Sequence, residues 1–135
     1  MTDPAAPAPD AADGAVALSQ RLQDAARSGD AATLTTYVDA GVPVDLVGEA
    51  GDTFVMLAAY HGHPEVVQAL LDRGADPNLP NAKGQTPLGG AVFKGFVDVV
   101  RVLVANGADP DAGTPSARVA ATMFDRQDLL ALLDR

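Results

Sequence analysis

Two histidines and a glutamate lie close together at His61, His63 and Glu65, and these side chains could do chemistry. Imidazole and carboxylate groups are zinc ligands, and a zinc ion with an open position activates water for hydrolysis. Gly62 and Pro64 separate the three residues, however, and indicate that one helix ends and another begins here. Nothing at this spacing holds two imidazoles on one side of an ion. We therefore interpret the cluster as structural and keep a small metal-dependent hydrolase as an alternative function.

The rest of the chain offers few residues for catalysis. Cysteine is absent, which excludes a thiolate nucleophile, a thiolate metal site and disulfides. The serines have no histidine at a meaningful spacing, and there is no glycine-rich phosphate loop, nucleophile elbow or Walker lysine pattern. The aspartates between Asp109 and Asp128 fail the calcium-loop pattern, because no glutamate follows at the required position. The sequence therefore predicts a protein that is not an enzyme and has no cofactor or metal.

A segment from Gly51 to Leu79 recurs thirty-three residues later, from Gly84 to Ala112. A fixed period of this length is typical of proteins in which each repeat is one supersecondary unit. The matching positions are Gly51-Asp52-Thr53 with Gly84-Gln85-Thr86, Ala58 with Ala91, Gly62 with Gly95, Val66-Val67 with Val99-Val100, Leu70 with Leu103, and Gly74-Ala75-Asp76-Pro77 with Gly107-Ala108-Asp109-Pro110. We therefore take this repeat as the unit from which the fold is built.

Each repeat is predicted to form two short helices. Thr53 and its counterpart Thr86 are suited to cap the first helix, because a threonine oxygen accepts a hydrogen bond from a backbone N–H that has no partner in the helix. Gly62 and Gly95 can end that helix. The second helix carries one apolar stripe, made by Val66, Val67, Leu70 and Leu71 in one repeat and by Val99, Val100, Leu103 and Val104 in the next. A single helix pair cannot bury such a stripe, so each repeat must stack against another.

The units at the two ends of the chain are degenerate copies. The first has an apolar stripe that ends near Gly29, thirty-three residues before Gly62, but it lacks the Thr-Pro-Leu start. In the last unit, Asp128-Leu129-Leu130 matches Asp98-Val99-Val100 at an offset of thirty, so three residues are missing from the preceding loop. Either Thr114 or Ser116 could then cap its first helix, and both registers stay open. Such degeneracy is expected, because terminal repeats need an outer face that is compatible with water.

The repeat resembles the ankyrin repeat. The motifs that carry the resemblance are the period itself, Thr86-Pro87-Leu88, Gly62-His63, Val66-Val67 and Gly74-Ala75-Asp76. The resemblance implies an all-α solenoid of stacked helix-turn-helix units, with two full repeats between two degenerate capping repeats. We expect these units at about 16–47, 48–80, 81–112 and 113–135. We expect a disordered Ala/Pro-rich tail at residues 1–15, because too few apolar side chains lie there to offset the entropy of ordering.

The resemblance also implies where a partner binds. Ankyrin-like repeats bind on a concave face formed by loop fingers and by the exposed ends of the first helices. Transferred position by position, the expected partner-binding residues are Arg27, Glu49, Asp52, Tyr60, His61, Lys83, Gln85, Phe93, Lys94, Met123 and Phe124. Interface cores favour aromatic and methionine side chains, so we interpret Tyr60, Phe93 and Met123 as a binding stripe. The alternative is that Phe93 and Met123 pack under the fingers as core.

Two adjacent glycines depart from the family pattern at Gly89 and Gly90, within the first helix of a full repeat. Each glycine should weaken that helix by ~1 kcal/mol relative to alanine. A locally soft helix or a close approach by a partner would each explain them.

The composition narrows the class of partner. The formal net charge is −9, so the chain lacks the basic face that phosphate contacts need, and nucleic acid and anionic membranes are poor candidates. Electrostatic steering favours a protein partner with a basic surface, although the charge alone also confers solubility. There is no apolar run near the ~20 residues that span a bilayer. We expect a cytoplasmic monomer, and the preference for arginine over lysine suggests a bacterial source.

The sequence thus predicts a non-catalytic protein–protein interaction module that acts as an inhibitor or a scaffold. Two alternatives remain. One is the metal-dependent hydrolase that uses His61, His63 and Glu65, and the other is a subunit of a larger assembly.

Overall fold

The computed structural model describes residues 11–48 and 50–134. Within these ranges the chain forms helices and no strand. The helices are α1 (Ala11–Ser28), α2 (Ala31–Asp39), α3 (Phe54–Tyr60), α4 (Pro64–Leu71), α5 (Pro87–Lys94), α6 (Val97–Ala105), α7 (Ala117–Met123) and α8 (Gln127–Leu133). None of the helices in these ranges combines the length and the apolarity that crossing a membrane would require.

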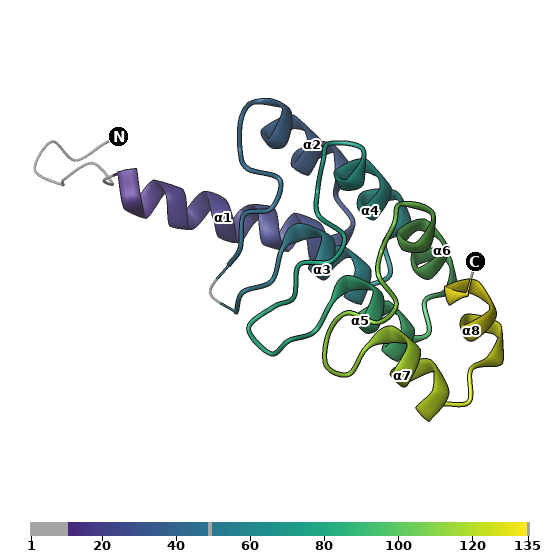
Figure 1. Cartoon of the computed structure of the whole chain (residues 1–135). Helices are drawn as coiled ribbons and strands as arrows, with labels where there is room; N and C mark the ends of the chain where they lie inside the picture. Colours follow the sequence, from purple (N-terminus) through teal and green to yellow (C-terminus); the bar gives the residue numbers. More distant parts are fainter. Residues whose placement is uncertain (1–10, 49, 135) are drawn as a thin grey trace, which may run out of the picture.

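The helices form two rows (Figure 1). Helices α1, α3, α5 and α7 lie side by side in one row, and α2, α4, α6 and α8 form the other. Each helix packs against its neighbours in the row and against the other helix of its own repeat. The loops that join successive repeats project on the side of α3, α5 and α7. This arrangement confirms the predicted all-α solenoid.

Side-chain caps start the first helix of three repeats. The hydroxyl oxygen of Thr53 accepts a hydrogen bond from the Met56 amide at 3.1 Å, and Thr86 does the same for Gly89 at 3.1 Å. In the last unit the cap is Ser116, which accepts from the Val119 amide at 3.1 Å. The structure therefore selects the register counted back from the second helix, and the alternative start at Thr114 is wrong.

The turn between the two helices of a repeat needs a left-handed backbone. Gly62 has a φ of +81° and Gly95 a φ of +77°, values that glycine adopts without the steric cost that a Cβ brings. In the last unit Asp125 stands at the matching position with a φ of +52°, the only non-glycine residue with a positive φ in the described ranges. Aspartate is among the residues that tolerate this region best, so the same turn forms with aspartate in place of glycine.

The predicted apolar stripes form the core. Val66, Val67 and Leu70 in α4, like their three counterparts in α6, are 0–1% exposed. Leu71 and Val104, which were expected in the same stripes, are partly buried and pack against the core from its edge. Burial of a leucine side chain contributes ~1.5–3 kcal/mol, so the stripes supply much of the driving force for stacking.

The outer faces of the terminal units are more polar than the middle of the stack. Arg118 lies two residues after the cap of α7, and the residue at the same position in α5 is the buried Leu88. Its guanidinium forms ion pairs with Asp111 at 2.8 Å and with Asp134. At the other end, the Arg21 guanidinium lies 5.7 Å from the centre of the Tyr37 ring. These contacts end the solenoid with groups that water can solvate, as the degenerate first and last repeats predict.

Helix α1 begins earlier than the sequence analysis expects. Order was expected from near Val16, whereas α1 begins at Ala11 and extends beyond the other helices (Figure 1). Alanine is the strongest helix former, and alanines recur through the start of this helix, which accounts for the difference. Residues 1–10 lie outside the described residues, so the disordered tail stays a prediction there.

We predict that Leu70→Ala or Leu103→Ala lowers the free energy of unfolding by ~2–5 kcal/mol, because both side chains are completely buried between repeats and their loss leaves a cavity. Urea titration followed by circular dichroism measures the change. Val119→Ala is the control, since this side chain is 48% exposed, and it should cost less than ~1 kcal/mol. A loss below ~0.5 kcal/mol for either leucine variant would show that the assigned stripes are not the core.

A second prediction tests how closely the loop fingers stack. Gly51 and Gly84 both have a φ of +78°, so an alanine at either position costs ~1–2 kcal/mol of backbone strain. A Cβ at Gly51 would also lie 2.8 Å from the backbone nitrogen of Ala82, whereas at Gly84 the nearest atom would be the Thr114 Cβ at 3.9 Å. Gly51→Ala should therefore lower the melting temperature clearly more than Gly84→Ala. Equal losses would mean that the fingers do not approach as described.

Candidate protein-binding surface

A polar groove of about 310 Å³ lies between two fingers and the end of α3. Six of its lining residues belong to the predicted binding set, namely Arg27, Asp52, Tyr60, His61, Lys83 and Gln85. They come from three repeats, and the stacking of those repeats is what brings them together. The predicted Glu49 lies outside the described residues.

A smaller apolar groove of about 190 Å³ lies between the first helices of the second, third and fourth units. Its walls include Tyr60 from α3, Phe93 from α5 and Ala120 from α7. Gly89 and Gly90 also line it, and a Cβ at Gly90 would lie only 3.1 Å from the Met56 Cε atom. The two glycines therefore serve the close packing of neighbouring repeats. Tyr60 and Gln85 line both grooves, so the two grooves adjoin.

Exposed apolar side chains border the apolar groove. Phe93 is 57% exposed and Phe124 is 50% exposed, and their rings meet edge to face with centres 5.5 Å apart. Met123 is 70% exposed and lines neither groove. The alternative that Phe93 and Met123 pack as core is therefore wrong, while their part in binding stays a prediction.

Two cationic groups lie beside the polar groove. The Lys94 ammonium is 5.1 Å from the centre of the Tyr60 ring, within the range of a cation–π contact. Arg27 pairs with Asp24 at 2.8 Å, and both side chains are exposed. Partial burial, together with the charges of Arg27, His63 and Lys94, lowers the pKa of His61 below its ordinary value. The imidazole is therefore neutral near pH 7 and can both donate and accept a hydrogen bond.

His63 has a structural role. Its Nε2 atom lies 2.7 Å from the carbonyl oxygen of Arg27 in the preceding repeat, a hydrogen-bonding distance. Its ring covers Gly29, where a Cβ would lie 2.7 Å from the His63 Nδ1 atom. Phe96 covers Gly62 in the same way one repeat later. Across residues 11–48 and 50–134, no three potential ligands among histidine, aspartate and glutamate converge as a metal site would need, so the hydrolase alternative has no support.

Asn81 organises the finger beside the polar groove, and it was not among the predicted residues. Its side-chain amide donates to Asp52 at 2.9 Å and to the Gln85 side chain at 2.9 Å. Its side-chain oxygen accepts from the backbone amides of Lys83 and Gln85 at 3.0 Å each. An asparagine at the start of a tight loop is the available signal, because its side chain commonly bonds to backbone groups further along. Asn81 thus links two fingers and positions three predicted residues.

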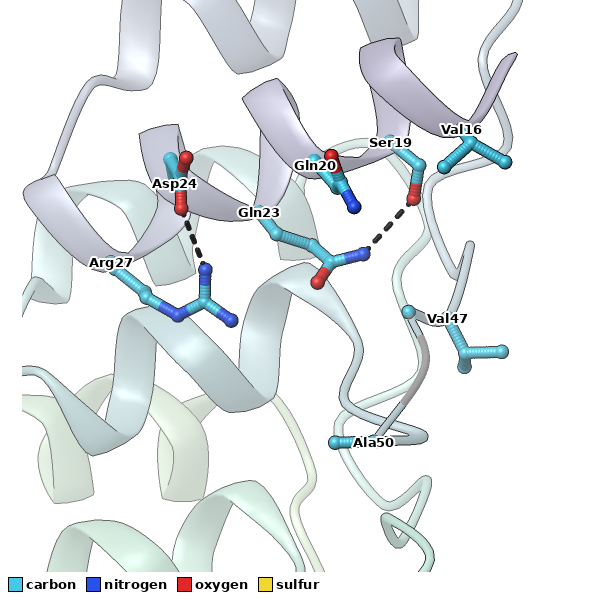
Figure 2. A pocket seen from close by; sticks show the side chains of 9 residues that line it. Val16, Ser19, Gln20, Gln23, Asp24, Arg27, Val47 and Ala50 are labelled. Carbon is cyan, nitrogen blue, oxygen red and sulfur yellow. Dashed lines mark hydrogen bonds and ion pairs between the residues drawn. The ribbon is translucent and has the colours of Figure 1, made fainter. Parts of the chain in front are cut away.

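A third hollow of about 570 Å³ extends the surface along α1, and we call it the N-terminal hollow (Figure 2). Ser19, Gln20 and Gln23 of α1 face Val47 in the loop before α3. The Gln23 amide donates to the Ser19 hydroxyl at 3.0 Å. Arg27 and Ala50 line both this hollow and the polar groove. The three hollows therefore form one surface from α1 to α7, which we call the concave track.

Comparison with known proteins agrees with this geometry. The family model "Ankyrin repeats (3 copies)" matches residues 22–114. A curated protein of Pseudomonas aeruginosa that is named an ankyrin repeat protein is 40% identical over 48 residues, which is 36% of this chain. The match spans 28% of the length of that relative. This chain therefore belongs to the ankyrin-repeat family, as its motifs, its stacked helix pairs and the family match all indicate.

Proposed function

We propose that this chain is a non-catalytic module that binds another protein along the concave track and so inhibits it or holds it in place. Ankyrin repeats are generally protein–protein interaction modules, which supports the class of function. The observation that carries the proposal is the exposed pair of Phe93 and Phe124 beside the apolar groove. Aromatic side chains of this kind supply much of the binding energy in protein interfaces. The monomeric state and the cytoplasmic location stay predictions.

The convex side of the molecule differs in its chemistry. Gln68 in α4 donates to Asp72 at 2.7 Å and accepts from Asn106 of the next repeat at 3.2 Å, so its polar groups are used within the fold. Of the exposed large apolar side chains in the described ranges, Val16, Val47 and Phe93 line the concave track, and Phe124 contacts Phe93. This distribution favours the concave side as the place where a partner binds.

We predict that Phe93→Ala with Phe124→Ala lowers capture of the natural partner from source lysate by at least about tenfold, since interface energy concentrates in such residues. Quantitative mass spectrometry of the captured proteins measures the loss, and circular dichroism confirms that the variant is folded.

Arg101→Ala, an exposed change on α6, is the control and should leave capture intact. The proposal fails if the double aromatic variant captures the same proteins as the wild type, or if the control alone loses them.

A further inference from the structure

Both lysines of this acidic chain lie at the concave track. The formal net charge is −9, and Lys83 and Lys94 are the only lysines in the sequence. Lys83 lines the polar groove, and Lys94 ends α5 with its ammonium beside the Tyr60 ring. Resting on the proposed function, we propose that the concave track binds an acidic segment of the partner protein. One apolar side chain of that segment fills the apolar groove, and carboxylates flanking it contact Lys83 and Lys94.

Among the described residues, neither lysine charge is taken up by an ion pair. In residues 11–48 and 50–134, Arg27, Arg73, Arg118 and Arg126 have carboxylate partners within 4.0 Å, whereas neither lysine does. Asp52, which lines the polar groove, and Asp24, which lines the N-terminal hollow, each have an internal partner. Asp52 accepts from the Asn81 amide, and Asp24 pairs with Arg27. Carboxylates of a partner would therefore pair with the two ammonium groups without displacing an ion pair among residues 11–48 and 50–134.

The size of the apolar groove indicates what enters it. Pockets for small molecules usually have about 300–1,000 Å³, and the apolar groove has only about 190 Å³. This volume suits one apolar side chain. Because Tyr60 and Gln85 also line the polar groove, a chain segment that places a side chain there continues directly past Lys83. The bound segment must therefore carry its acidic residues next to its apolar residue.

The net charge alone suggests a partner with a basic surface, whereas the charges at the concave track favour an acidic segment. A net negative chain steers basic partners toward itself at long range, but charges separated by more than about 8 Å are largely screened at physiological salt. Contacts in the bound state depend on the charges that line the track, and charge complementarity there decides which partners fit. Burial is the main cause of the lowered pKa of His61, and the nearby charges of Arg27 and Lys94 lower it further while Asp52 opposes them.

The test selects peptides from a displayed random library against the wild-type chain at physiological salt. We expect the enriched peptides to carry an apolar residue flanked by aspartate or glutamate. Lys83→Glu with Lys94→Glu should weaken binding of the best peptide by at least about tenfold. Lys83→Met with Lys94→Met removes the charges but keeps the length of the side chains, and it should weaken binding in the same direction. Urea titration checks that each variant is folded.

A matched control separates local charge from net charge. Arg21→Glu with Arg101→Glu changes the net charge by the same amount as the lysine reversal, and these arginines form no ion pair within the described ranges. Binding should stay within about twofold of the wild type. Equal losses from both reversals, enrichment of basic or uncharged peptides, or no enrichment would overturn the inference. The proposed function is tested separately. It stands if the Phe93→Ala, Phe124→Ala variant loses partner capture, even when one of these results rules out the acidic segment.

Discussion

The structure depends on the fact that one pair of short helices cannot bury its own apolar stripe. Leu70 and Leu103 become fully buried only because each repeat stacks on its neighbour. Helices of 7 to 9 residues, such as α3, α4, α5 and α6, would be marginal alone in water, so packing rather than helix propensity supports them. The same stacking brings the ends of α3, α5 and α7 and the intervening fingers together as one surface. Stability and recognition therefore have one origin.

Small residues set how closely the repeats approach. The ring of His63 covers Gly29 and the ring of Phe96 covers Gly62, so each turn glycine leaves room for a side chain of the next repeat. Gly90 lets the Met56 and Tyr60 side chains of α3 lie against α5. Gly90 and Tyr60 also form part of the wall of the apolar groove.

Much of the fold was predictable from the sequence, because the repeat shows its caps and its turn glycines at fixed intervals. The start of α1 was not, because the Ala/Pro-rich composition before Val16 predicted disorder, while only the alanines indicate a helix. The cap at Ser116 was ambiguous because the shortened loop leaves two plausible starts. Whether Phe93 is exposed depends on how the neighbouring repeat packs, and the position of Phe93 within the thirty-three-residue repeat does not reveal this. The hydrogen bond from Asn81 to Asp52 likewise connects two fingers, and no local pattern reports such a contact.

Site-specific photo-crosslinking in source cells tests the central claim, which is that the concave track is the face that binds. A benzophenone amino acid replaces Phe93 on the concave side in one variant and Arg101 on α6 in another. Both side chains are exposed, so both variants should fold. The account predicts that irradiation joins a partner protein to the chain that carries the probe at 93 and not to the chain that carries it at 101. Adducts formed only from position 101 would contradict it.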